Sequence, residues 1–353
     1  MTAAGRGPGL LERLDAGPVI CAEGYVFELE RRGYLQAGPF VPEVVLDHPE
    51  EVSTLHREFV HAGSDVVEAL TYYAHREKLR AVGKDGRLEE LNRRALDLAR
   101  QVADETGTLF AGNVCNTNVY DPADRDTQVR TREMLEEQVR WAAEASVDFV
   151  VGETFRYAGE ALIALEVIRD AGLSAVVTLA VGRRPETREG WSLADACERL
   201  ADEGAGVVGL NCIRGPATML PLLAPIAAAV DVPVAALPVP YRTSADQPTF
   251  QSLAEPDADL LPESNPFPTA LDPFTCNRYE IAAFARSAAA AGARYFGLCC
   301  GAGPHHVRSM AEALGRQPAA SRYSEDMSKH VFLGSDPGLA DHNLDYGKQL
   351  LGR

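Results

Sequence analysis

Short apolar runs alternate with amphipathic stretches along most of this chain. The apolar runs are rich in Val, Leu, Ala and Phe and have the length of single strands. They are almost continuously apolar, as expected for parallel strands that are covered on both faces. Eight such runs are predicted as strands: 18–23, 65–72, 108–113, 148–154, 174–181, 206–212, 233–239 and 294–300.

The stretches between these runs show the periodicity of amphipathic helices. Ser192, followed three residues later by Asp195, resembles a helix cap. Helices are predicted at 48–61, 87–104, 128–145, 158–171, 190–203, 217–229, 278–291 and 304–314. Eight strands that are each followed by a helix, joined by right-handed crossovers, predict a single-domain (β/α)8 TIM barrel.

Three segments do not follow this alternation. Long connections are expected at 25–47 and at 240–276, both after strands and therefore on the face where barrel active sites lie. The barrel domain is assigned to residues 1–316. Residues 317–353 are polar and irregular, and we expect a short C-terminal extension that either serves as an oligomerisation arm or wraps the barrel.

Charge and composition narrow the function classes. The chain has 353 residues, a net charge of −17 and a pI of about 4.9, so its surface repels nucleic acid and anionic membranes. It contains no apolar run long enough to span a membrane. The segment 1–9 is Gly-rich and lacks the apolar core of a secretory signal, so we expect a cytoplasmic location.

The cysteines carry the candidate chemistry. Cys212 ends the sixth strand run, and Cys299 and Cys300 end the eighth, so all three map to the carboxyl rim of the barrel. Three thiolates can converge on one tetrahedral Zn²⁺ and leave its fourth position open for a substrate. The remaining cysteines are predicted to be core thiols: Cys21, Cys115, Cys197 and Cys276.

Adjacent residues of a strand point to opposite faces, so Cys299 and Cys300 can share one ion only where the backbone leaves strand geometry. Gly301 and Gly303 make such a turn feasible. A helix beginning near Pro304 would place its positive end beside the thiolates. The next two residues, 305 and 306, are both histidine and are predicted as a surface pair.

A ligand set made only of sulfur suits a thiol substrate, which can bind as a fourth sulfur and lose its proton. Hydrolytic zinc sites more often use His and carboxylate ligands, so a hydrolase is disfavoured. No Gly-rich dinucleotide fingerprint follows the first strand and no P-loop is present. The pattern therefore favours alkylation of sulfur over activation of water.

Two motifs resemble the zinc signatures of the homocysteine S-methyltransferase family: Gly209-Leu210-Asn211-Cys212 and Gly297-Leu298-Cys299-Cys300-Gly301. Segments 10–14, 27–34 and 55–59 are similar to its betaine–homocysteine branch. The resemblance implies a zinc barrel that moves a methyl group from an onium donor to a thiol. The default donor it implies is glycine betaine, and the default acceptor is homocysteine, which gives methionine.

The resemblance also implies residue roles. Glu153 matches the glutamate that contacts the amino group of homocysteine, and Asn211 matches the asparagine beside the first zinc ligand. Phe40 and Tyr73 match aromatic residues around the methylated donor, which cation–π attraction would hold. Tyr73, rather than its neighbour Tyr72, is predicted to point inward.

Three positions depart from the family pattern. The family has Asp-Gly-Gly after its first strand, whereas this chain has Ala22-Glu23-Gly24, so the carboxylate is shifted by one residue. Glu23 is kept as a substrate-binding candidate because its side chain is long and the strand is ending. Thr154 replaces a tyrosine and is also kept as a substrate-binding candidate, and Leu298 replaces a glycine. Glu68, in the second strand, is predicted to be structural.

These departures leave alternatives open. The same zinc chemistry could serve another thiol acceptor or another donor, such as a sulfonium or a different betaine. A zinc-binding barrel without catalysis is the alternative from another class. The partners expected in the first two cases are small molecules, with a homo-oligomer as a further expectation.

Overall fold

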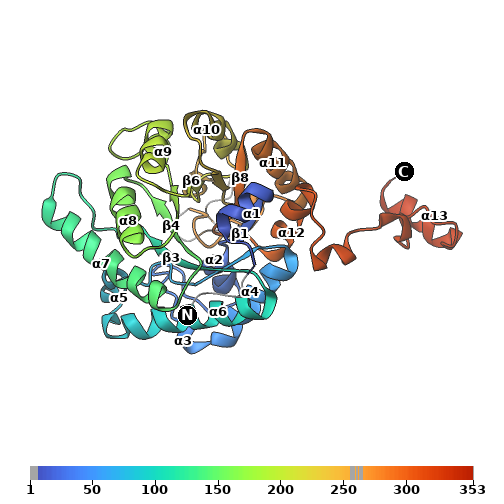
Figure 1. Cartoon of the computed structure of the whole chain (residues 1–353). Helices are drawn as coiled ribbons and strands as arrows, with labels where there is room; N and C mark the ends of the chain where they lie inside the picture. Colours follow the sequence, from blue (N-terminus) through green and yellow to red (C-terminus); the bar gives the residue numbers. More distant parts are fainter. Residues whose placement is uncertain (1–6, 255–258, 260, 262–264, 353) are drawn as a thin grey trace.

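Eight parallel strands close into a barrel in sequence order, as predicted (Figure 1). The computed structural model describes residues 7–254, 259, 261 and 265–352. The first and last strands pair directly, with Val19 opposite Tyr295. The strands are β1 (Val19–Ala22), β2 (Val66–Glu68), β3 (Leu109–Cys115), β4 (Phe149–Phe155), β5 (Ala175–Leu179), β6 (Val207–Asn211), β7 (Val234–Leu237) and β8 (Ala293–Leu298).

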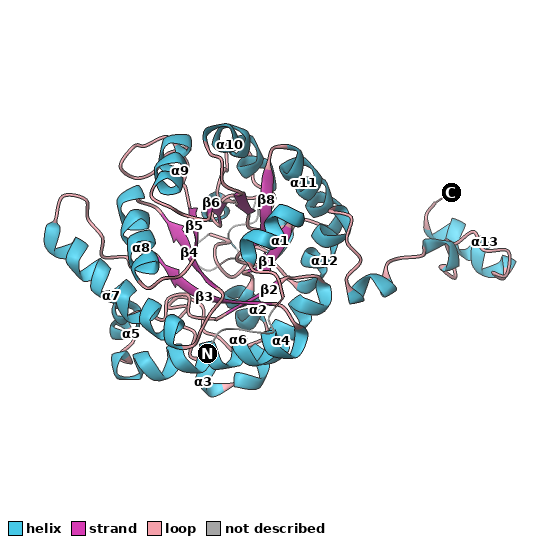
Figure 2. Ribbon diagram, viewed as in Figure 1, coloured by secondary structure: helices cyan, strands magenta, loops and turns pink. Residues whose placement is uncertain are grey.

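An outer ring of helices covers the barrel (Figure 2). The main helices are α4 (Pro49–Ala62), α6 (Leu88–Thr106), α7 (Arg125–Glu144), α8 (Ala158–Asp170), α9 (Leu193–Asp202), α10 (Pro216–Ala229), α11 (Arg278–Ala290) and α12 (Pro304–Ala313). Ser192 caps α9 as predicted, since its side chain accepts a hydrogen bond from the Asp195 amide. None of the helices in the described residues is long and apolar enough to cross a membrane.

The barrel interior is filled by apolar side chains, which leaves only its carboxyl end for a site. Phe149 and Tyr295 lie in an interior cluster with alternate residues of the other strands. Leu10 and Leu14 belong to the same cluster. They come from α1 (Leu10–Ala16), so this short helix closes the amino end of the barrel.

The two long connections contain more structure than expected. Segment 25–47 is a long connection after β1, as predicted, and it contains two short helices, α2 (Tyr25–Arg31) and α3 (Val44–Asp47). Part of segment 240–276 lies outside the described residues. Its described part forms short 3₁₀ turns at Phe250–Ser252 and Asp272–Phe274.

The C-terminal extension begins against the barrel and then leaves it (Figure 1). Ser321 donates a hydrogen bond to Glu312 of α12 at 2.8 Å. Farther along, α13 (Asp341–Leu350) replaces the predicted irregular chain. Phe332 contacts Tyr346, while Leu333 and Tyr346 remain exposed. The role of this extension as an oligomerisation arm stays a prediction.

Candidate thiol site and its acidic cavity

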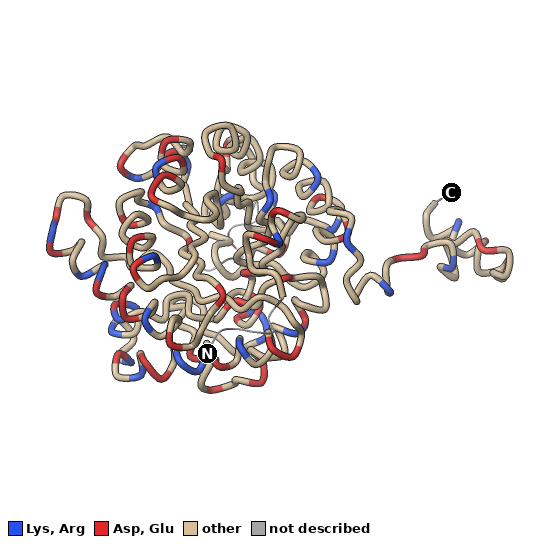
Figure 3. Tube along the Cα trace, in the orientation of Figure 1, with Lys and Arg blue, Asp and Glu red and all other residues tan. Residues whose placement is uncertain are grey.

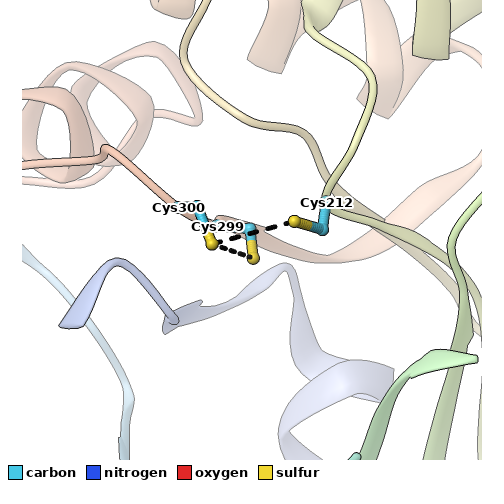
Figure 4. Close-up of side chains that lie close together, drawn as sticks. All are labelled: Cys212, Cys299 and Cys300. Carbon is cyan, nitrogen blue, oxygen red and sulfur yellow. Dashed lines mark hydrogen bonds between the residues drawn. The ribbon is translucent and has the colours of Figure 1, made fainter. Parts of the chain in front are cut away.

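Three cysteine sulfurs meet at the carboxyl end of the barrel (Figure 4). The Sγ of Cys300 lies 3.8 Å from the Sγ of Cys212 and 3.8 Å from that of Cys299. All three sulfurs lie within 4.8 Å of one another and could hold a metal ion. Cys212 directly follows β6, and Cys299 and Cys300 are the first two residues after β8, so the three cysteines lie just beyond the strands that were predicted to end with them.

The backbone after both strands turns sharply to bring the sulfurs together. Cys212 has a φ of 55°, a conformation that L-residues rarely adopt. Gly301 has a φ of 96°, and a Cβ there would lie 2.1 Å from the Tyr241 hydroxyl. The amides of Cys212 and Cys299 donate to the carbonyls of Leu237 and Pro238, at the end of β7. The intervening strand therefore fixes both turns.

The three thiols differ in pKa. The neighbouring thiols hydrogen-bond to Cys212 and lower its pKa well below the ordinary thiol value. The contact with Cys212 in turn raises the pKa values of Cys299 and Cys300 well above the ordinary thiol value. Cys212 is thus the first of the three to become a thiolate, which is the form that binds metals.

Next to the thiols lies a narrow cavity of about 20 Å³ whose lining is acidic. Glu153, on β4, accepts hydrogen bonds from Asn113 at 2.7 Å, Asn211 at 2.6 Å and Thr154 at 3.1 Å. Burial raises the pKa of Glu153 to about 7 against the lowering effect of the Asn113 hydrogen bond. The two asparagines therefore orient a carboxylate toward the cavity.

Two further glutamates, Glu23 and Glu68, line this cavity, which we call the carboxylate cavity. Glu68 accepts a hydrogen bond from Asn113 at 2.7 Å, and Glu23 faces Asn211 at 3.4 Å. Burial raises the pKa values of Glu23 and Glu68, and the nearby Glu153 raises them further. No lysine or arginine is among the described residues of the lining. The cavity consequently favours a cationic group such as an ammonium.

The residues that the sequence predicted for substrate binding differ in how close they lie to this cavity. Glu23, just beyond β1, lines the cavity together with Glu68, which had been predicted to be structural. Thr154 lies next to the cavity residue Glu153, to which its hydroxyl donates a hydrogen bond. Its amide donates a second hydrogen bond, to Asn211 at 2.9 Å. The role of Thr154 in substrate binding stays a prediction.

The aromatic candidates lie farther out. The cavity is lined by Tyr72, whose ring centroid is 4.3 Å from that of Tyr73. Tyr73 also has the ammonium of Lys78 over its ring at 4.0 Å. Phe40 is half-buried and stacks on Phe27 at 5.3 Å. The donor-binding roles of Phe40 and Tyr73 stay predictions.

Sequence reasoning missed Asn113 and misplaced His306. Asn113 gives no signal in one sequence, because its importance depends on two glutamates that lie 45 and 40 residues away along the chain. His306 was predicted to lie on the surface, but it is buried. Its ring accepts from the Gly303 amide at 3.1 Å and lies 3.0 Å from the carbonyl of Cys276, so it joins α12 to the loop after β7.

The other four cysteines lie in the core, as predicted. Cys21, Cys115, Cys197 and Cys276 are buried free thiols. Desolvation raises the pKa of each of them above the ordinary thiol value. They remain protonated at neutral pH, which separates them from Cys212.

Fold and site together define a (β/α)8 barrel that gathers three cysteine sulfurs at its carboxyl end. The sequence profile of the homocysteine S-methyltransferase family matches residues 20–314. The chain therefore belongs to the homocysteine S-methyltransferase family, and it is a methyltransferase.

Individual relatives agree with this assignment. Betaine–homocysteine S-methyltransferase 1 of Xenopus tropicalis is 36% identical, over 97% of this chain and 83% of its own. S-methylmethionine–homocysteine S-methyltransferase of Mus musculus is 34% identical, over 97% of this chain and 93% of its own. The metallated crystal structure of the Escherichia coli homocysteine methyltransferase MmuM shares the fold. Its TM-score is 0.66 at 19% identity, over 84% of this chain and 97% of that chain.

Proposed function

We propose that the enzyme holds Zn²⁺ with Cys212, Cys299 and Cys300 and transfers a methyl group from an onium donor to homocysteine. The observation that carries the proposal is the pair of 3.8 Å distances between the three sulfurs. A tetrahedral zinc with Zn–S bonds of about 2.3 Å separates its sulfur ligands by about 3.8 Å. The sulfurs are therefore already spaced for that ion.

A zinc ion at this site would lower the pKa of an acceptor thiol and so supply a nucleophile at neutral pH. The carboxylate cavity supplies the orientation. Glu153, with Glu23 beside it, accepts the ammonium of the acceptor, while Asn211 holds the Glu153 carboxylate at 2.6 Å. Fixing the acceptor at its ammonium aligns its sulfur for attack on a methyl group, which is a large source of rate enhancement.

The donor in this proposal is glycine betaine. Its methylated cation would lie against the aromatic residues around the cavity, among which Phe40 and Tyr73 are the candidates. Cation–π attraction of about 0.5–2 kcal/mol for each ring favours a quaternary ammonium there.

The metal test pairs a ligand with a core cysteine. Cys212→Ser should lower the zinc content of purified enzyme well below one per chain, whereas Cys197→Ser should leave it near one. Cys197 is the matched control because it is buried in α9, away from the thiol site. Equal zinc contents in the two variants would refute the ligand assignment.

The activity test measures methionine formed from homocysteine and glycine betaine by the zinc-loaded enzyme. A sulfonium donor is the second candidate, favoured by the 34% identity to the mouse enzyme that is named for S-methylmethionine. Methionine from S-methylmethionine, with none from glycine betaine, would replace the default donor. One zinc per chain without transfer from any onium donor would leave a non-catalytic barrel.

A further inference from the structure

A second pocket opens at the loops that follow β4 and β5. It has a volume of about 510 Å³, within the range of small-molecule sites. Four arginines line it, namely Arg156, Arg183, Arg184 and Arg188, and Glu186 is the acidic residue among the described lining. This arginine pocket thus carries a net formal charge of +3 on a chain whose net charge is −17, in which acidic residues outnumber basic ones (Figure 3).

The arginine pocket is tied to the thiol site by the chain itself. Ile213, the neighbour of Cys212, lines it. Arg214 follows, and its guanidinium donates to two consecutive backbone carbonyls of the loop after β5, at 2.7 and 2.9 Å. The amide of Arg188 donates to the carbonyl of Arg156 at 2.8 Å, so this loop is also fixed to the end of β4. A ligand in the pocket would therefore be held next to the thiols.

Much of the positive charge in the arginine pocket has no partner. Arg184 pairs with Glu186 at 2.8 Å, and Arg188 lies over a tyrosine ring. The side chains of Arg156 and Arg183 form no hydrogen bond or ion pair with the described residues. Two unpaired guanidinium groups that line one pocket suit a carboxylate, which arginine binds in a bidentate manner.

The carboxylate cavity and the arginine pocket have linings of opposite charge. Cys299 and Cys300 line the first, and Ile213, the residue after Cys212, lines the second. We propose that the arginine pocket binds the carboxylate of the methyl donor, while the carboxylate cavity holds the ammonium of the acceptor. This inference rests on the proposed methyl transfer. It assigns the donor carboxylate to arginines of the loops after β4 and β5.

The kinetic test uses a double variant that lacks the two unpaired guanidinium groups, those of Arg156 and Arg183. Arg156→Ala/Arg183→Ala should raise the KM for glycine betaine by at least about tenfold, because both guanidinium groups that would hold the donor carboxylate are removed. The KM for homocysteine should stay unchanged. Arg140→Ala is the matched control, since this exposed arginine lies in a separate pocket that holds four glutamates. A rise in the homocysteine KM with an unchanged donor KM would overturn the proposal.

A binding test works without turnover. Succinate, titrated into the zinc-loaded enzyme by calorimetry, should bind saturably to the wild type and to Arg140→Ala but not to the double variant. Absence of saturable binding, or equal binding by the double variant, would overturn the proposal. Much tighter binding of inorganic phosphate than of succinate would overturn the assignment to a carboxylate. If no donor is turned over, the proposed function fails, while succinate binding still decides whether the pocket holds anions.

Discussion

Asn113 is the residue on which the carboxylate cavity depends, and Asn113→Ala isolates its contribution. Its amide nitrogen donates to Glu68 and to Glu153, each at 2.7 Å, inside the barrel. Hydrogen bonds to charged groups contribute roughly 1.5–3 kcal/mol each, and burial strengthens them. At the lower end of that range, losing both should reduce the free energy of unfolding by about 3 kcal/mol.

Asn92→Ala is the matched control. Asn92 is also buried, and its amide nitrogen also donates twice, at 2.8 Å, but to the backbone carbonyls of Ala74 and Leu88. Its amide oxygen also accepts a hydrogen bond from Gln138 at 3.0 Å. Neutral hydrogen bonds contribute about 1 kcal/mol each, so losing all three should cost about 3 kcal/mol, close to the loss expected for Asn113→Ala. Asn92 lies outside the thiol site and should leave the kinetics unchanged.

Two measurements compare the variants, and the KM for homocysteine is the one expected to differ between them. Denaturant unfolding gives both stability losses, and steady-state kinetics gives the KM for homocysteine. Asn113→Ala should raise that KM by about tenfold, because Glu153 loses one of the groups that orient it, whereas Asn92→Ala should not. An Asn113→Ala enzyme with wild-type stability and an unchanged KM would refute the role assigned to Asn113 in holding Glu68 and Glu153.

Three other changes test separate parts of the structure. Burial lowers the pKa of His56 from its ordinary value of 6.5 to about 3, so it opposes folding as pH falls below 6.5. The wild type should therefore lose about 2 kcal/mol of stability between pH 7 and pH 5 through this histidine, and His56→Leu should abolish that loss in denaturant unfolding. Gly301→Ala should lower zinc retention because its Cβ meets a buried tyrosine, whereas Gly315→Ala, with open space, should retain zinc. If the C-terminal extension joins subunits, deleting 326–353 should lower the number of chains per particle in light scattering. An unchanged number of chains would refute its role as an oligomerisation arm.

The sequence was sufficient to predict the barrel and the thiol site because both follow from order along the chain. In a barrel of parallel strands, residues that follow β6 and β8 must meet at the carboxyl rim. Cys212, Cys299 and Cys300 could therefore be placed together before any distance was known. Glu153 could be placed beside them because it lies near the end of β4.

Side-chain direction could not be predicted where the strands end early. Tyr72 and Tyr73 were placed by strand alternation, but β2 ends at Glu68, and Tyr73 has a φ of 59°. Alternation no longer holds there, and Tyr72 lines the cavity. Likewise, the one-residue shift of Glu23 did not carry it to the wrong face, because β1 ends at Ala22.

The same departure from strand geometry accounts for the opposite charges of the two pockets. Thr154 has a φ of 63° and its amide donates to Asn211, so β4 bulges directly after Glu153 before Phe155 pairs with Leu179. That bulge leaves Glu153 in the carboxylate cavity and places Arg156, only three residues later, in the arginine pocket. A β-branched residue with positive φ is strained, and such strain persists where surrounding contacts hold it. The hydrogen bonds from Asn211 to both neighbouring residues are those contacts, so this asparagine beside the first thiol also keeps the two charges apart.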